Sequence, residues 1–112
     1  MAFDLIGRLL LAAFFAIGAV QKITAPAVVE GLLTGAGLPG WLIWPALAFN
    51  AALAVALALG WRLREAALLG AAYCIVTSYF HFIPGDGWQM SIFVKNWAIA
   101  GGLFILVGPR RA

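Results

Sequence analysis

The residues of this chain that could do chemistry are a few ionisable and amide side chains set among apolar residues. They are Lys22, Glu30, Asn50, His81, Gln89, Lys95 and Asn96. Lysine, histidine and amide groups donate hydrogen bonds to carbonyl or phosphate oxygens, and histidine also exchanges protons near neutral pH. Ionisable groups inside apolar segments are costly and are typical of functional sites. The set predicts a site for a ligand with a polar head, and whether the protein catalyses a reaction stays open.

Lys95 is the most unusual member of this set, because it lies one turn inside an apolar segment. A lysine there needs a partner, and Glu30, Asp86 and nearby backbone carbonyls are the candidates. Lys95 shares a helical face with Ala98 and Gly102, which favours an inward orientation. The alternative is a lysine whose flexible stem carries its charge back to the lipid headgroups. We expect a buried and paired Lys95.

His81 is the single histidine of the chain, and Cys74 is the single cysteine. One imidazole without further histidine or thiolate ligands is a poor metal site, so no metal is expected. One thiol closes no intramolecular disulfide. Two roles stay open for His81, which are a structural hydrogen bond and a contact or proton transfer to a polar ligand. Ser78 shares a face with both residues, but no acyl-transfer motif accompanies them, so a nucleophile is not expected.

The composition places this chemistry in a membrane. The 112 residues are 65% hydrophobic and only 10% charged, whereas soluble domains are about 25% charged. A soluble fold of this size buries too little of its surface to hide so many apolar side chains. The net charge of +3 comes from scattered Lys and Arg residues without a basic run, which argues against nucleic-acid binding. We therefore expect one transmembrane domain, residues 1–112, whose main partner is the lipid bilayer.

Four apolar stretches are close to the length of about 20 residues that a membrane-crossing helix needs. They cover residues of about 5–21, 41–60, 65–83 and 92–108. The second stretch is rich in alanine and leucine, a helical composition. Small residues recur in it at Ala48, Ala52, Ala56 and Gly60. This spacing lets neighbouring helices approach closely. The predicted fold is all-α, an integral membrane four-helix bundle.

The segment between the first two spans is too polar and too broken to cross a membrane. Thr24 can cap a helix that has Pro26 in its first turn, and glycines from Gly35 onward end it. We expect a short helix of about residues 25–35 at the membrane interface. The later connection, residues 84–91, is rich in turn residues and predicts a loop.

Positive charges indicate the orientation of the bundle. Four spans place both termini and the link after the second span on one side of the membrane. The positive residues on that side are Arg8, Arg62, Arg64, Arg110 and Arg111. Lys22 and Lys95 fall on the other side. Because Lys and Arg are enriched in cytoplasmic segments, both termini are predicted to be cytoplasmic. The candidate site residues then gather in the outer half of the bundle.

Several motifs resemble the DoxX family of small four-helix membrane proteins. The first span closes on GAVQK, residues 18–22, and the next connection ends in GLP, residues 37–39. In the last third, FHF at residues 80–82 precedes FVKNWAIAGG at residues 93–102. The resemblance covers nearly the whole chain, although Ala19 and Gln21 replace glycines that the family pattern leads us to expect. The family's polar motif falls on Lys22, His81, Gln89, Lys95 and Asn96.

The resemblance implies a multi-pass protein of the bacterial inner membrane. Some DoxX relatives form the membrane part of thiosulfate:quinone oxidoreductases or join membrane oxidoreductase complexes. This implies a membrane subunit or partner of an oxidoreductase system, with a quinone as its ligand. The chain contains no recognisable redox centre and no covalently bound cofactor is expected, so electrons would come from a partner. The alternative is a non-catalytic scaffold or assembly factor, and a homo-oligomer is compatible with both hypotheses.

Overall fold

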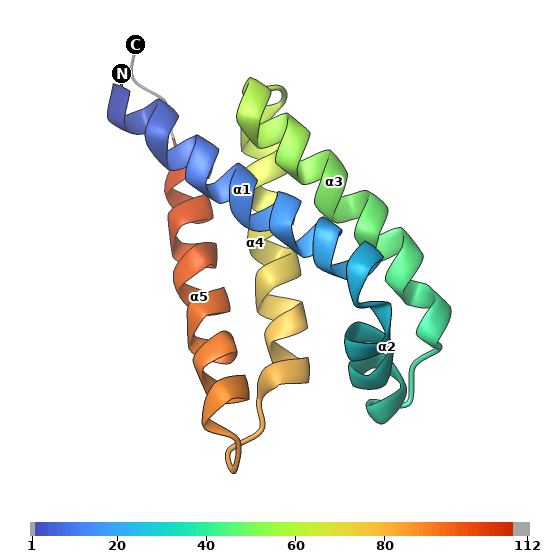
Figure 1. The fold of residues 1–112 in the computed structure, drawn as a ribbon. Coiled ribbons are helices and arrows are strands. Elements are labelled where there is room, and N and C mark those ends of the chain that lie inside the picture. Colours follow the sequence, from blue (N-terminus) through green and yellow to red (C-terminus); the bar gives the residue numbers. More distant parts are fainter. Residues whose placement is uncertain (1, 109–112) are drawn as a thin grey trace. The chain divides into compact units, whose positions relative to one another are not determined.

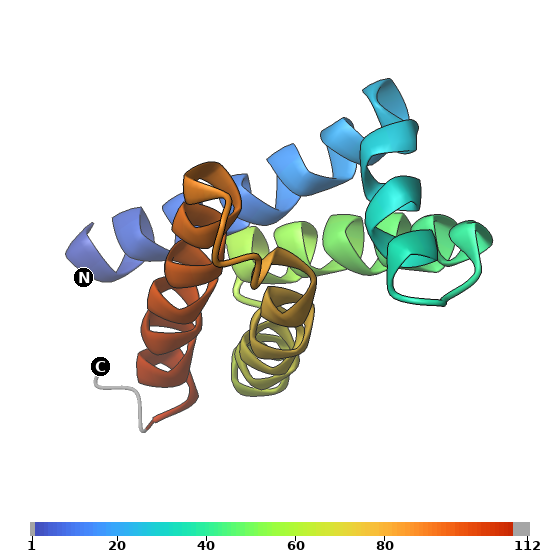
Figure 2. The ribbon, with the colours of Figure 1, turned by 90° about the horizontal axis from the view of Figure 1, so that it is seen from below.

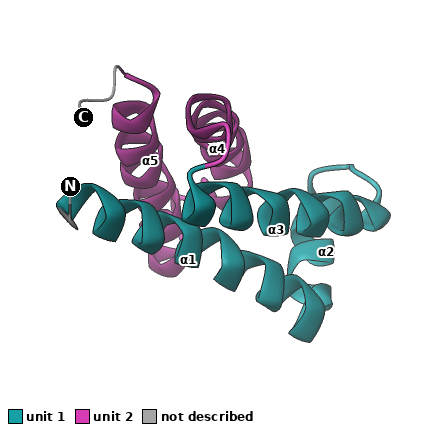
Figure 3. Cartoon of the chain, turned by 90° about the horizontal axis from the view of Figure 1, so that it is seen from above, with its two compact units in different colours: residues 1–60 teal, residues 61–112 magenta. Residues whose placement is uncertain are grey.

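The computed structural model describes residues 2–108. Every regular element in this range is a helix, as the composition predicts. The chain divides into two compact units, Met1–Gly60 and Trp61–Ala112, which Figure 3 colours separately. The prediction that the whole chain forms one transmembrane domain stays a prediction. Arg110 and Arg111, which contribute to the predicted orientation, lie outside the described residues.

Unit 1 consists of two long helices connected through a short one. α1 covers Ala2–Thr24, α2 covers Pro26–Gly35 and α3 covers Ile43–Leu59, and a short 3-10 helix, η1, covers Gly40–Leu42. In Figures 1 and 2, α2 turns away from the axis of α1 and leads the chain toward the start of α3. α3 then packs against α1. The tertiary contact of this unit is therefore mainly a contact between two helices.

One face of α1 forms this contact through side chains spaced three and four residues apart. Its buried apolar members are Ala12, Phe15 and Ala19. Residues at this spacing share one side of a helix. The same spacing extends to Arg8 at one end and to Lys22 at the other. The face that packs against α3 thus carries a positive side chain at each end.

The buried face of α3 differs from the face that small residues predict. Its buried residues are Ile43, Asn50, Leu53, Ala56 and Leu57. Ala48 and Ala52 are exposed, and of the alanines in the predicted stripe only Ala56 is buried. Large apolar side chains and Asn50 make up the rest of the buried face.

Unit 2 is a pair of antiparallel helices, visible in Figure 1. α4 covers Leu63–Ser78 and continues into a 3-10 helix, η2, at Tyr79–His81, and α5 covers Gly87–Val107. Six residues of α4 are buried, namely Ala66, Ala67, Gly70, Ala71, Cys74 and Ser78. All six are small, which lets α5 approach closely. Packing in this unit therefore depends on short side chains rather than on large interlocking ones.

Three of the four expected spans have the length and composition to cross a membrane. They are Phe3–Thr24, Gly40–Leu59 and Gly87–Val107. α4 has 16 residues, which corresponds to about 24 Å of helix, and the hydrocarbon core of a bilayer is about 30 Å thick. The four-helix membrane bundle therefore stays a prediction, and the structure supports an all-helical chain with three long apolar helices.

The short helix between the first two spans agrees with the prediction, but its capping does not. α2 has Pro26 in its first turn, where the missing N–H costs nothing. Thr24 does not cap it, because it is the last residue of α1 and its hydroxyl donates to the carbonyl of Val20. Whether α2 lies at the membrane interface stays a prediction.

The loop predicted at residues 84–91 is too long. α5 begins at Gly87, because the carboxylate of Asp86 accepts hydrogen bonds from the backbone N–H groups of Trp88 and Gln89. An aspartate in this position satisfies N–H groups that have no partner within the helix. The last residues of the expected loop, from Gly87 onward, are therefore the first turn of a helix.

Candidate functional site

Lys22 and Asn50, two of the predicted site residues, meet inside unit 1. The ammonium group of Lys22 donates a hydrogen bond to Oδ1 of Asn50 over 2.7 Å. Both residues are buried, with 9% and 2% of their surfaces exposed. Among residues 2–108 no carboxylate pairs with Lys22. The positive charge is therefore held next to a neutral amide.

The side chain of Lys22 runs back along α1. Its Nζ atom lies 3.5 Å from the carbonyl oxygen of Gly18, one turn earlier in the helix. Side chains of a helix tilt toward its N-terminus, and a lysine near a membrane surface usually extends its stem the other way to reach the headgroups. Lys22 is in the last turn of α1, yet its charge points toward the middle of the helix. This orientation is the reverse of what a lysine with a purely solubilising role adopts.

Gly18 provides the space in which these groups meet. A Cβ atom at this position would lie 3.3 Å from Oδ1 of Asn50 and 4.0 Å from Nζ of Lys22. The first distance is shorter than ordinary van der Waals contact, so a side chain here would push the amide away. Gly18 is also the first residue of the GAVQK motif. Because Gly18 has no side chain, it leaves room for the contact between Lys22 and Asn50, and this gives the motif a physical role.

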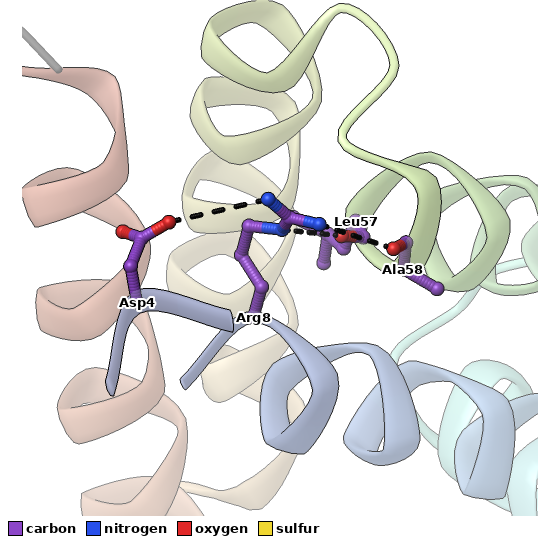
Figure 4. Close-up of polar contacts among 4 residues, drawn as sticks. All are labelled: Asp4, Arg8, Leu57 and Ala58. Carbon is purple, nitrogen blue, oxygen red and sulfur yellow. Dashed lines mark hydrogen bonds and ion pairs between the residues drawn. The ribbon is translucent and has the colours of Figure 1, made fainter. Parts of the chain in front are cut away.

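Arg8 forms the second polar contact between α1 and α3. Its Nε atom donates to the carbonyl of Leu57 over 3.1 Å and its Nη2 atom to the carbonyl of Ala58 over 3.2 Å, as Figure 4 shows. These carbonyls belong to the last turn of α3, where they have no partner within the helix. Asp4 lies 4.0 Å from the same guanidinium. Arg8 therefore caps α3, a role that its use as a topology signal does not predict.

Gly60 leaves room for the guanidinium group of Arg8 at the C-terminal end of α3. It follows α3 in the left-handed conformation, with φ of 73°, which glycine adopts without a steric penalty. A Cβ atom there would lie 3.4 Å from the guanidinium of Arg8. A glycine directly after an apolar helix is a sequence signal for its end, and it is the signal that could have pointed to an external cap.

His81 and Gln89 form the corresponding pair in unit 2. Nδ1 of His81, in η2, lies 2.6 Å from Oε1 of Gln89 in the first turn of α5. A carbonyl oxygen only accepts hydrogen bonds, so Nδ1 carries the proton in this arrangement. In the neutral ring Nε2 is then free to accept a proton or a hydrogen bond. The structural hydrogen bond expected of His81 is present, and Nε2 keeps the second role open.

The expectation of a buried Lys95 is wrong, because its side chain is exposed. Asp86, one of its proposed partners, caps α5, and the predicted pairing of Lys95 stays a prediction. Asn96, the next residue, is buried, with 6% of its surface exposed. The side chain of Lys95 thus lies on the surface of α5, whereas Asn96 lies on its buried face.

Glu30 is half-buried on α2. Its aliphatic stem lies near Gly40, where a Cβ atom would meet it at 3.8 Å. Glu30 belongs to unit 1 and Lys95 to unit 2. Four of the seven predicted site residues therefore form two pairs, Lys22 with Asn50 in unit 1 and His81 with Gln89 in unit 2.

The donor set suits a ligand oxygen better than a metal ion. In the described part of the chain no group of three or more His, Cys, Asp or Glu side chains could hold a metal. Cys74 is buried and free. An ammonium group, an amide and an imidazole are instead suited to carbonyl and hydroxyl oxygens.

The helical fold and the three long apolar helices place the chain in the class of small, all-helical membrane proteins. Comparison with known proteins identifies the particular family. The chain belongs to the DoxX family, whose model matches residues 3–83. This range contains GAVQK and FHF but ends before residues 93–102, so the resemblance in the last third lies outside the matched range.

A curated relative extends the similarity to most of the chain. The inner membrane protein YqjF of Escherichia coli (strain K12) is 28% identical over 108 residues, which cover 94% of this chain and 83% of the relative. No solved structure gave a significant match. The comparisons therefore establish the family and leave the ligand and the partners open.

Proposed function

We propose that this DoxX-family protein is a multi-pass protein of the bacterial inner membrane that binds a quinone or a similar polar-headed lipid through Lys22. In this proposal it serves as a membrane subunit or partner of an oxidoreductase system. The observation that carries the proposal is the buried ammonium group of Lys22, which is directed away from the near end of α1 and held by Asn50. The inner-membrane relative supports the location.

The hydrogen-bonding capacity of Lys22 supports an oxygen-bearing ligand. An ammonium group has three donors. In the described structure one goes to Asn50 at 2.7 Å and a second reaches the carbonyl of Gly18 only at 3.5 Å. Placing a lysine inside an apolar span costs up to about 3 kcal/mol on insertion scales, and neutral partners offset this cost only in part. A ring carbonyl would supply a further acceptor without adding a charge to the apolar span.

His81 is a separate candidate for proton exchange within unit 2, because with the proton on Nδ1 facing Gln89 the Nε2 atom can accept a proton. The proposal assigns the electron donor to a partner protein. Within unit 1, Glu30 remains a further candidate for a contact with the ligand head.

A titration with a short-chain quinone tests the proposal. The protein would be placed in nanodiscs, and quenching of its tryptophan fluorescence by a water-soluble ubiquinone analogue would be measured. We expect saturable quenching that Lys22→Met weakens at least tenfold, because a charge-assisted hydrogen bond contributes about 1.5–3 kcal/mol. Gln21→Met is the matched control, since Gln21 is exposed in the same turn of α1. Linear, unsaturable quenching, or an equal effect of both variants, would contradict the proposal.

A second candidate function is a non-catalytic scaffold or assembly factor. The observation that favours it is that Arg8 and Lys22 both connect α1 to α3, so both charges have a structural use. A scaffold predicts that Lys22→Met unfolds unit 1 and that bound quinone does not raise the unfolding temperature. Ligand binding predicts the opposite result for the second measurement, because a ligand of the folded state stabilises it by mass action.

A further inference from the structure

A shallow depression, open to its surroundings and called the cavity below, lies on the surface of unit 2 at the end where α4 begins and α5 ends. Its volume is about 280 Å³. The lining residues are Arg64, Glu65, Leu68 and Val107. Pockets for whole drug-sized ligands measure about 300–1,000 Å³. The cavity is thus of a size for one polar headgroup rather than for an entire lipid.

The chemistry of the lining changes over one helical turn. Arg64 and Leu68 are four residues apart on α4 and so lie on the same side of the helix. Val107 contributes a second apolar side chain from the last turn of α5. Arg64 and Glu65 therefore lie in the first turn of α4, Val107 lies beside them at the end of α5, and Leu68 extends the apolar surface one turn further along α4. This is the order in which a membrane lipid presents its headgroup and its acyl chains.

The two charged side chains of the cavity, Arg64 and Glu65, have opposite signs, and both can bind a ligand group of the opposite charge. Arg64 forms no hydrogen bond or ion pair with any residue between 2 and 108. Glu65 pairs with Arg62 at 3.4 Å, with about 60% of both side chains exposed. An exposed pair of this kind contributes little free energy, so a bound cation can replace it easily.

We propose that this cavity binds the phosphoethanolamine headgroup of a membrane phospholipid. The phosphate accepts hydrogen bonds from the guanidinium of Arg64, which suits phosphate oxygens. The primary ammonium group donates to the carboxylate of Glu65, and Leu68 and Val107 contact the start of an acyl chain. A choline headgroup has no N–H group to donate, and a glycerol headgroup has no positive charge for Glu65. The proposed site is independent of the quinone proposal, because all its residues belong to unit 2, whereas Lys22 and Asn50 belong to unit 1.

Native mass spectrometry of the full chain in lipid mixtures tests this site. The probes are phosphatidylethanolamine, phosphatidylcholine and phosphatidylglycerol with identical acyl chains, added in equal amounts. We expect the wild-type protein to retain phosphatidylethanolamine roughly three- to fivefold over phosphatidylcholine, as fits an ion pair at an exposed position. Equal retention of these two lipids, a preference for phosphatidylglycerol, or no retained lipid would overturn the proposal.

Four variants separate the parts of the site. Glu65→Gln should abolish the preference for ethanolamine over choline, and Arg64→Gln should lower retention of both lipids alike. Leu68→Trp fills the cavity while keeping its charges, and it should lower retention of both lipids even if a charge variant folds poorly. Arg62→Gln, outside the lining, removes only the exposed partner of Glu65 and should leave retention of phosphatidylethanolamine unchanged or raise it. If it lowers retention as much as Arg64→Gln does, general charge attraction explains the binding and the site is refuted.

Discussion

The ammonium group of Lys22 and the amide oxygen of Asn50 lie 2.7 Å apart between α1 and α3, and both residues are buried. A buried charge whose partner is removed costs more than the hydrogen bond itself contributes, because the charge stays in an apolar environment. This asymmetry makes the pair sensitive to single substitutions and tolerant of a matched double substitution.

Asn50→Leu should lower the free energy of unfolding by about 1–3 kcal/mol, because it leaves Lys22 without its short hydrogen bond. Adding Lys22→Met should restore part of the loss, since the pair is then replaced by apolar groups of similar size. The measurement is a double-mutant cycle on unfolding in mixed detergent micelles, followed by circular dichroism. Additive effects of the two substitutions would show that the residues do not depend on each other.

Substitution of Gly18 tests the space that the pair requires. Gly18→Ala places a Cβ atom 3.3 Å from Oδ1 of Asn50, so the amide must move, and we expect a loss of about 0.5–1.5 kcal/mol. Gly7→Ala in the same helix is the control, because a Cβ atom at Gly7 has nothing within 4 Å. That control should be neutral or stabilising by up to about 1 kcal/mol, because alanine favours helix. Equal shifts in unfolding temperature for both variants would contradict the explanation.

The cap formed by Arg8 makes a separate prediction. Arg8→Met removes the donors to the carbonyls of Leu57 and Ala58 and the positive charge at the C-terminus of α3, which should cost about 1–2 kcal/mol. Arg8→Lys keeps the charge and should recover part of this. Unfolding followed by circular dichroism gives both values. The same loss for lysine and methionine would mean that the forked geometry of the guanidinium, rather than its charge, carries the effect.

The predicted orientation can be tested by labelling. Cys74 is buried, with 1% of its surface exposed, so the natural thiol should react slowly and a Cys74→Ala background removes it altogether. In that background Gly85→Cys, in the link before α5, should react with a membrane-impermeant maleimide added to whole spheroplasts. Trp61→Cys, in the link before α4, should react only after the membrane is opened. The reverse pattern would place the termini outside.

The sequence predicts the helices better than it predicts their polar contacts. Composition and apolar length identify α1, α3 and α5, because both are local properties of the chain. The pairing of Lys22 with Asn50 and the cap that Arg8 forms depend on residues 28 and about 50 positions apart, which periodicity does not connect. Lys95 shows the reverse error, because its sequence position resembles a buried site while its side chain is exposed. Ligand binding is a further step that neither level determines.

Removal of the cap of α5 should affect the His81 pair at a distance. In Asp86→Ala the backbone N–H groups of Trp88 and Gln89 lose their acceptor, which should cost about 1 kcal/mol and loosen the first turn of α5. Because Gln89 lies in that turn, its bond to Nδ1 of His81 should weaken and the ring should populate both tautomers. The ¹⁵N chemical shifts of the imidazole report the tautomer directly. Asp86→Asn is the matched control, since asparagine also caps helices, and it should keep the proton on Nδ1. An unchanged tautomer in Asp86→Ala would show that Gln89 is held by something other than the helix cap.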